Sequence, residues 1–440
     1  MNQSSFSRRQ ALAVLASSAA MPLVSACARA VAVAPPAPAP VPPAAPAAPT
    51  DADAKALLDS IAENLLRLSP EGATGLGIDT GPRAPLRYQL SDRSAAGQQA
   101  VANLLRSDLA KAQEFDDSAL DFQMRTNIEV VRSSYSTALE GFAFPYGDVA
   151  VGGWRNTPYV VIQNVGAWLD VPQLLNNDQP LETKDDAEAY LARLAEFPKV
   201  LDGELGRLQS ARGMGLVPPT FLIDKTIPAL TLAAKDAASG GAMVDTLVKK
   251  TKTKNIAGDW ESRARAILEQ QVAPALQRQI AELQLERQKA TDDAGMWARP
   301  KGDEYYRWAL KAGTTTTLSP EQIHQMGRTQ VQQLHAQMDS ILKEIGYSRG
   351  SVGDRMKALA QDPKYKFSEG DAGRAEIMAF IQDRLKWINA QLPRAFNTLV
   401  HPNMEVKRMA PEAEPGAPSA YGGAGSIDGK IPGRSSSTER

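Results

Sequence analysis

The sequence has one cysteine and three histidines among its 440 residues. A single cysteine, Cys27, cannot form a disulfide within the chain, and it excludes a zinc site built from several cysteines. Lysine and arginine number 49 against 50 for aspartate and glutamate, so the formal net charge is −1. A nucleic-acid-binding protein needs a basic surplus to neutralise phosphates, so this balance argues against nucleic-acid partners. The chain is nevertheless 43% hydrophobic, enough for a large buried core.

Residues 1–26 are typical of an export signal. Arg8 and Arg9 stand directly before an apolar run from Ala11 to Val24, which is too short to cross a bilayer core of about 30 Å as a helix. The paired arginines favour the twin-arginine export route, although Ala11 stands where that signal usually has a bulky apolar residue. The alternative is a chance arginine pair in front of a general secretory signal.

The residues before Cys27, Val-Ser-Ala, resemble a bacterial lipoprotein box. That resemblance implies cleavage before Cys27 and a lipid on its thiol. The implied partners are the twin-arginine export machinery, the lipoprotein-processing enzymes and the lipid bilayer on the periplasmic side of the envelope, with Ala28 favouring the outer membrane. The alternative is an ordinary cleavage site beside an incidental cysteine. Residues 27–50, rich in alanine and proline, predict an extended tether because such a tract cannot pack a core.

A hydrophobic period near 3.6 residues dominates from residue 51 to 433, so we expect one mainly helical domain with long irregular connections. Residues 158–162 are the best short candidate for a strand, and the four lysines of residues 249–254 predict a solvated turn between helices. The predicted helices cover a stripe at residues 57–68 and then residues 92–113, 117–139, 185–212, 258–290, 319–344 and 369–399.

Two of these helices carry start or stop signals. Asp51 or Asp53 is the expected N-cap of the first helix. Ser319 followed by Gln322 is the pattern of a capping box, and Gly346 is well placed to end that helix.

Catalytic motifs are weak. Residues 346–350 match G-x-S-x-G, but a helix is expected before Ser348 where a nucleophile elbow needs a strand. His324 and His335 would lie on one helix with backbones about 16 Å apart, too far to chelate one ion. No histidine is followed by glutamate, so H-E-x-x-H is absent. The residues alone predict neither a catalytic residue nor a metal site.

Three segments together resemble a bacterial family known as domain of unknown function 885. Residues 69–77 (SPEGATGLG) are similar to its early Pro…Ala-Thr…Gly element. Residues 305–323 contain Tyr-Tyr, a threonine run and L-S-P-E-Q-I, similar to its Y…L…T…L-T/S-P-E-E-I segment. Residues 417–433 contain APSAY and DGKIPG, similar to AP-x-A-Y…DG-x-x-PG. Members are exported, often lipoprotein-type, mostly helical proteins related to zinc metallopeptidases.

The resemblance implies a carboxypeptidase-like, metal-dependent activity on peptides. Members continue beyond DG-x-x-PG into a short strand and a helix with an H-E-x-x-P-G-H-type motif, which would bind zinc. This chain has a polar tail there, residues 434–440. The residues that the resemblance places at the cleft are Tyr421, Asp428, Gly429, Pro432 and Gly433.

We therefore expect that the catalytic part is missing and that this chain is inactive and holds no cofactor, whereas full-length relatives hold zinc. Helices that have lost a packing partner would expose apolar surface. The alternative function is a non-catalytic envelope lipoprotein that binds peptides or serves as a scaffold.

Overall fold

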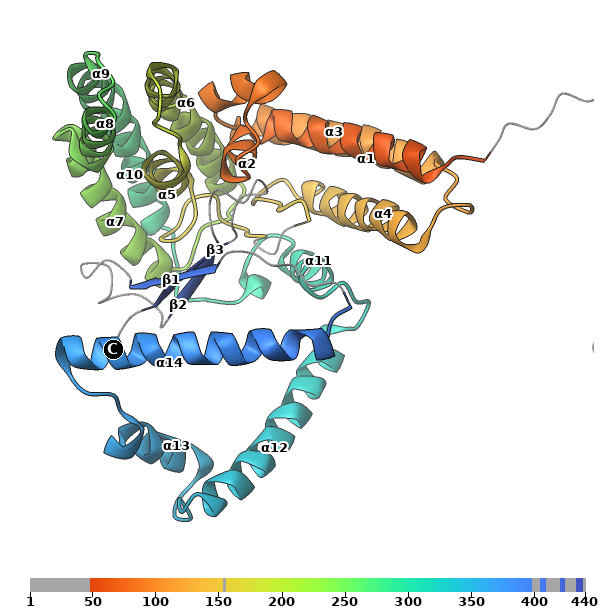
Figure 1. Ribbon diagram of the computed structural model, residues 1–440. Coiled ribbons are helices and arrows are strands. Elements are labelled where there is room, and N and C mark those ends of the chain that lie inside the picture. The colour runs from red at the N-terminus through yellow and green to blue at the C-terminus, as the bar shows by residue number, and fades with distance from the viewer. Residues whose placement is uncertain (1–47, 153–155, 398–403, 409–419, 424–432, 438–440) are drawn as a thin grey trace, which may run out of the picture. The chain divides into compact units, whose positions relative to one another are not determined.

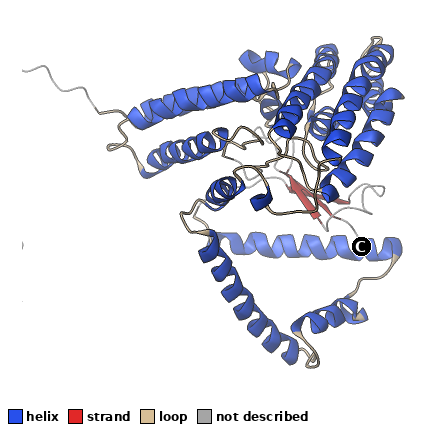
Figure 2. Ribbon diagram, turned by 180° about the vertical axis from the view of Figure 1, so that it is seen from behind, coloured by secondary structure: helices blue, strands red, loops and turns tan. Residues whose placement is uncertain are grey.

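The computed structural model describes residues 48–152, 156–397, 404–408, 420–423 and 433–437. The chain divides into two units, residues 1–47 and 48–440, and every described element belongs to the second. That unit is mainly helical, as the sequence predicts (Figures 1 and 2).

The first helix begins at a threonine. The Thr50 hydroxyl accepts from the Asp53 main-chain N–H at 3.3 Å, and the Asp53 carboxylate accepts from the Thr50 N–H at 2.8 Å. The N-cap is therefore Thr50, and the prediction of Asp51 or Asp53 was wrong by one position or more, because Asp53 serves as the capping-box partner instead. The N-terminal elements are α1 (Asp51–Leu68), α2 (Pro70–Gly75), the 3₁₀ helix η1 (Gly81–Tyr88), α3 (Ala95–Glu114) and α4 (Phe122–Phe142).

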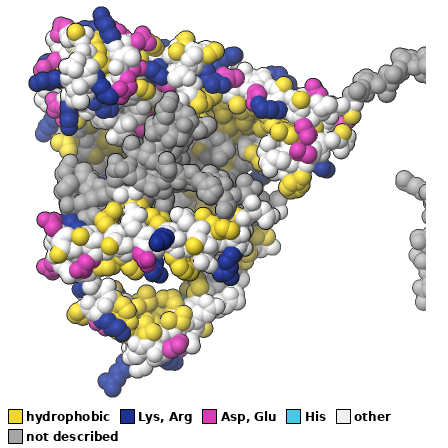
Figure 3. Space-filling view, viewed as in Figure 1, with side chains coloured by type: hydrophobic (Ala, Val, Ile, Leu, Met, Phe, Trp, Pro, Cys, Tyr) yellow, Lys and Arg dark blue, Asp and Glu magenta, His cyan; other side chains and the backbone are white. Residues whose placement is uncertain are grey.

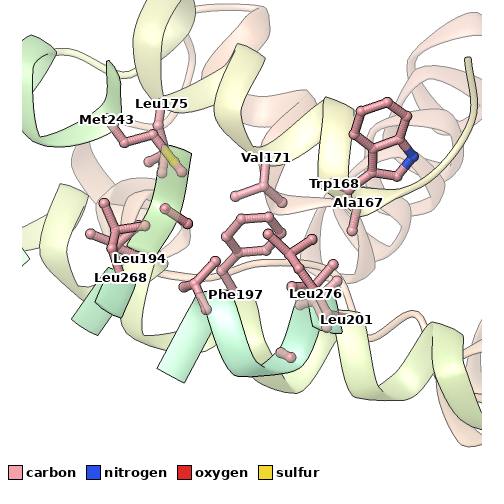
Figure 4. Packing of buried hydrophobic residues seen from close by; sticks show 14 of the residues in the cluster. Ala167, Trp168, Val171, Leu175, Leu194, Phe197, Leu201, Met243, Leu268 and Leu276 are labelled. Atoms are coloured by element: carbon pink, nitrogen blue, oxygen red, sulfur yellow. The ribbon is translucent and has the colours of Figure 1, made fainter. Parts of the chain in front are cut away.

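The main core lies among helices of the middle of the chain. Phe197 of α6 is almost fully buried, with Leu268 and Leu276 from the segment that follows α9 in the same cluster (Figure 4). α10 packs against both α6 and α7. Burying one such side chain stabilises the fold by about 1.5–3 kcal/mol. The elements here are α5 (Ala167–Gln173), the π turn η2 (Leu174–Asp178), α6 (Lys184–Gly213), α7 (Thr220–Ala238), α8 (Gly241–Thr253), α9 (Trp260–Ile267), the π turn η3 (Leu268–Val272), α10 (Ala273–Arg287), the 3₁₀ turn η4 (Met296–Ala298) and α11 (Gly302–Thr314).

The capping box of the next helix is confirmed. The Ser319 hydroxyl accepts from Gln322 N at 3.2 Å, and the Gln322 side chain accepts from Ser319 N at 2.8 Å. Gly346 follows the end of that helix with a φ of +96°, a conformation that glycine adopts without strain. The elements are α12 (Pro320–Glu344), α13 (Val352–Gln361), the 3₁₀ turn η5 (Pro363–Tyr365), α14 (Gly370–Gln391) and the 3₁₀ turn η6 (Leu392–Arg394).

Three short strands form a small sheet that the sequence analysis does not predict. Its order is β1-β3-β2, with β3 parallel to β1 and antiparallel to β2. Residues 434–437 of the polar tail lie in β3. The strands are β1 (Met404–Arg408), β2 (Ala420–Gly423) and β3 (Gly433–Ser437).

The prediction of a strand at residues 158–162 is wrong. Only two isolated bridges form nearby, Asp148 with Thr157 and Ile162 with Val165. Residues 159–162 are apolar because they are buried, not because they pair in a sheet. Burial explains this run of β-branched residues without any ladder.

The lysines of residues 249–254 do not form a turn between helices. α8 continues to Thr253, so the first three lysines lie in its last turns and Lys254 is its C-cap. Cations at a helix C-terminus interact favourably with the helix dipole, which accounts for their position. Lys250 is half-buried and donates to the main-chain oxygen of Asn176 at 2.8 Å.

Arg193 of α6 is fully buried and ties several N-terminal segments to this helix. Its Nε donates to Gln89 O at 2.9 Å, and Nη2 donates to Thr74 Oγ1 at 2.8 Å and Leu86 O at 3.1 Å. Nη1 donates to the Gln179 side-chain oxygen. These acceptors are all uncharged, and burial lowers the pKa of Arg193 to about 10. The guanidinium thus fixes loops from both sides of η1 in place.

Two buried glutamates of α10 lie one turn apart. Glu282 forms a two-pronged ion pair with Arg212 of α6. Glu286 is 1% exposed, and its Oε2 has no hydrogen-bond partner among the described residues. Burial, followed by the charge of Glu282, raises the pKa of Glu286 to about 8. Glu286 is therefore mostly protonated at neutral pH in the folded chain.

We expect the substitution Arg193→Met to lower the free energy of unfolding by about 3–5 kcal/mol, because several buried oxygens lose their donor at once. Guanidinium unfolding followed by circular dichroism measures this loss. Arg263→Met is the matched control, since Arg263 forms an exposed ion pair with Glu188 and should cost at most about 1 kcal/mol. Equal losses for the two variants would contradict the assignment.

We expect Glu286→Gln to remove a pH dependence of stability. A carboxyl whose pKa is raised by folding stabilises the folded chain fully below its ordinary pKa of 4.5, and that contribution is lost as pH rises towards 8. The variant should match the unaltered chain near pH 4.5 and exceed it by about 1–3 kcal/mol above pH 8. Urea unfolding at several pH values measures this, with the exposed Glu269→Gln as control. A difference that does not grow with pH would refute the buried neutral carboxyl.

Candidate functional site

Most residues that the sequence analysis singles out lie outside the described part of the chain. Tyr421 and Gly433 are the exceptions. Tyr421 lies in β2 opposite Ser436 of β3, and Gly433 begins β3 opposite Met404 of β1. The strands of these two residues therefore pair in one sheet. The predicted residues outside the described ranges are Arg8, Arg9, Cys27, Asp428, Gly429 and Pro432.

The residues that the structure describes do not fit the zinc that the family resemblance implies. His324 and His335 are both exposed on α12, three turns apart. Within the described ranges, no group of three or more His, Cys, Asp or Glu side chains is placed to hold a metal ion. Ser348 is an exposed residue in the turn that follows α12, and a helix, not a strand, precedes it.

The best candidate site lies where the irregular connection between α4 and α5, residues 143–166, meets α11. Tyr146 of this connection packs on Tyr305 of α11 with ring centroids 5.6 Å apart. Phe144 meets the Tyr305 ring edge to face at 5.3 Å, and Trp308 lies 5.2 Å on its other side. Such offset aromatic pairs each add about 0.5–1.5 kcal/mol to the gain from burial. We call these residues, with Tyr159, the Tyr305 cluster.

The three tyrosine hydroxyls of the cluster differ in their partners. Tyr146 donates to Pro300 O at 2.6 Å, and Arg299 Nε donates to the Tyr159 oxygen at 2.9 Å. The Tyr305 hydroxyl is buried and has no partner among the described residues. Burial, then the neighbouring Tyr146, raises the pKa of Tyr305, so its phenol stays protonated and can donate.

An ion pair fixes the connection beside the cluster. Arg207 of α6 donates to Asp148 Oδ1 at 2.6 Å and to Gly147 O at 2.5 Å. Gly147 has a φ of +83°, and a Cβ there would lie 2.5 Å from Thr157 O. Only glycine suits this position, because the backbone strand containing Thr157 runs too close for a side chain. The main chain next to Tyr146 is therefore held rigidly.

Two grooves flank the cluster. The first has a volume of about 240 Å³ and is lined by Phe144, Tyr146 and Arg207, with glutamines of α3 opposite. The second, about 180 Å³, is lined by Trp308 and by serine and threonine residues of α4 and of residues 315–317. Val149 lines both grooves. The cluster is thus a wall that ligands on either side can touch.

A larger groove of about 930 Å³ runs between η2 and α8. Its charged groups are largely engaged with one another: Arg87 pairs with Asp79 and Asp186, and Lys250 donates to a main-chain oxygen. Its arginine and carboxylates therefore already act as structural partners. The Tyr305 cluster, with an unused buried hydroxyl, is the better candidate for ligand binding.

The arrangement suits a ligand that combines apolar side chains with carbonyl groups. Aromatic rings provide flat apolar contact, and few polar groups among them fix orientation. Sequence reasoning placed Tyr305 only in a family-like segment and described residues 142–168 only as irregular. The signal that could have found the site is the concentration of aromatic and glycine residues in a connection between two strongly periodic helices.

The comparisons concern the whole chain. Residues 70–437 match the model of a family described as "Bacterial protein of unknown function (DUF885)". No protein of the curated set matches. A candidate lipoprotein from Colwellia psychrerythraea, of known crystal structure, is 25% identical with a TM-score of 0.80, covering 89% of this chain and 67% of that one. A candidate lipoprotein of unknown function from Shewanella oneidensis is 13% identical with a TM-score of 0.58, covering 88% of this chain and 64% of that one.

The second likeness shows the shared fold alone, because its identity is low. The chain spans about two thirds of the length of each of these solved relatives. Both comparisons agree with the mainly helical architecture of the described residues.

We expect Tyr305→Phe to leave the free energy of unfolding unchanged or to raise it by about 1 kcal/mol, because the hydroxyl that it removes is buried without a partner. Tyr146→Phe, which loses a made hydrogen bond to Pro300, should lower it by about 0.5–1.5 kcal/mol. Thermal and urea unfolding of both variants measure the contrast. A clear loss of stability in Tyr305→Phe would mean that the hydroxyl has a structural partner.

Proposed function

Because this chain belongs to the DUF885 family of bacterial proteins of unknown function, as its motifs predict, we propose that it is an exported envelope protein that binds peptides at the Tyr305 cluster. The fold resembles that of a metal-dependent, carboxypeptidase-like peptidase in this proposal, and the chain itself is inactive. The observation that carries it is the buried, unpartnered hydroxyl of Tyr305 within a wall of aromatic rings.

The envelope location rests on two supports. Arg8 and Arg9 precede an apolar run, and Cys27 follows a lipoprotein-like box. The solved relatives are both described as candidate lipoproteins. In the proposal, the twin-arginine route exports the chain and a lipid on Cys27 anchors it on the periplasmic side, with the outer membrane favoured. None of the described helices combines the length and the hydrophobicity that a membrane span requires.

Peptide binding would use groups that are already in position. Pro300 holds the Tyr146 hydroxyl and Arg299 holds the Tyr159 hydroxyl, so both rings are fixed before a ligand arrives. Fixed rings lose little entropy on binding. The Tyr305 hydroxyl would donate to a peptide carbonyl, replacing an unsatisfied group by a made hydrogen bond. An apolar peptide side chain would pack on Phe144 or Trp308.

The alternative function, a non-catalytic peptide-binding or scaffold lipoprotein, shares this site and differs in chemistry. Zinc is expected in full-length relatives, whereas the described residues of this chain offer no site for it. No catalytic step is therefore assigned to any residue here. Hydrolysis of peptides by this chain, with zinc supplied, would contradict the proposed inactivity.

We expect short peptides with free termini to bind the full chain, and Tyr305→Phe to weaken binding about tenfold, equivalent to about 1.4 kcal/mol. Isothermal titration calorimetry with a defined set of tripeptides and hexapeptides measures this. Tyr306→Phe is the control, since Tyr306 is the neighbouring residue and is exposed. Equal affinities for the two variants, or no binding by the unaltered chain, would refute the proposal.

A further inference from the structure

The helices α12, α13 and α14 bury almost none of their own residues. The buried residues are Leu342 alone in α12, Arg355 alone in α13 and Gly373 alone in α14. Helices in water owe most of their stability to packing of an apolar face. Three well-formed helices without such packing therefore call for a covering partner.

The apolar residues of α12 fall on one face. Met326, Val331, Leu334, Ile341 and Ile345 recur at spacings that keep them on one side of a 3.6-residue helix. Each of them is between 43% and 57% exposed. Most side chains on the opposite side are polar or charged, so α12 is amphipathic with its apolar side uncovered.

The C-terminal part of this segment carries exposed aromatic residues. Phe380 and Trp387 of α14 are 52% and 57% exposed, and Phe396 beyond η6 is 57% exposed. Figure 3 shows hydrophobic side chains gathered over the region of α12–α14. A typical monomer exposes an apolar patch of about 300–600 Å² at most, and such a patch usually marks an interaction site. We call these residues of α12 and α14, with Phe396, the uncovered apolar face.

We propose that the uncovered apolar face is the docking surface for a further segment of the same polypeptide, the counterpart of the third of the Colwellia chain that this sequence does not match. The family match runs over residues 70–437 and so includes α12–α14, which are part of the shared fold. The Colwellia relative has additional residues, since the match covers 67% of its length. The composition of the face, with Ile, Leu, Phe and Trp, is that of a domain core cut open.

A lipid surface fits the face less well. Helices that lie on membranes carry mainly Lys and Arg on their polar side. α14 instead carries the exposed acids Asp371, Glu376 and Asp383 among its basic residues, and α12 pairs Asp339 with Lys343. Mixed charge of this kind is typical of a helix whose polar side faces water and whose apolar side faces protein.

The proposal is independent of peptide binding at the Tyr305 cluster, and its first test is the mass of the native protein. Intact mass spectrometry of the protein recovered from the bacterial envelope should give a mass well above that of residues 27–440 plus a lipid. A mass equal to residues 27–440 plus lipid would overturn the proposal.

The second test compares the 440-residue chain with the native-length protein. In the 440-residue chain, Ile341→Glu and Trp387→Glu should leave the melting temperature unchanged and reduce self-association. In the native-length protein, each should lower the melting temperature by about 4 °C or more, because a charge would enter a covered apolar interface. Phe122→Glu is the control, because Phe122 of α4 is 80% exposed and lies outside the uncovered apolar face.

Two results of this comparison would assign the face to another occupant and overturn the proposal. One is a stable dimer of the native-length protein, detected by light scattering, that Ile341→Glu dissociates. The other is binding of the native-length protein to vesicles of phosphatidylethanolamine and phosphatidylglycerol that Trp387→Glu abolishes. Unchanged melting of both variants in the native-length protein would equally refute it.

Discussion

A buried positive charge without a carboxylate partner organises the N-terminal half of this protein. Taking a guanidinium out of water is costly unless its donors are satisfied, and Arg193 meets this requirement with uncharged oxygens from α2, η1 and the end of η2. Those segments have few other reasons to meet α6, since η1 is a short 3₁₀ helix and the loops around it lack a regular backbone ladder. The ordering of loops far apart in the chain is therefore a consequence of one side chain.

The middle of the molecule follows the opposite strategy, leaving polar groups unsatisfied. Tyr305 and Glu286 are both buried with an atom that has no partner among the described residues. At Glu286, proton uptake relieves the cost, because the neutral carboxyl tolerates burial better than the ion. A phenol cannot be relieved that way, because it is already neutral. An unused hydroxyl among rigid rings is thus the feature that separates the Tyr305 cluster from ordinary aromatic packing.

Sequence reasoning succeeded where the determinants are local. The Ser319 capping box and the length of α12 follow from residues within one turn of each other. It missed α7, which has Pro228 inside it, and it missed β3, whose pairing depends on backbone groups and not on apolar alternation. The Tyr305 cluster was out of reach for a different reason. Tyr146 and Tyr305 meet only through tertiary packing, and no periodicity in the sequence links two residues so far apart.

The π turn η3 has a consequence for how the family can vary. Residues 258–290 read as one helix along the sequence, but η3 winds an extra residue between α9 and α10. One residue turns the following face by about 100°, so α9 and α10 are two helices in packing terms although the chain never leaves helical geometry. Relatives could gain or lose a residue within Leu268–Val272 by tightening or loosening this turn, while Trp260 at one end and Leu283 at the other keep their places in the core.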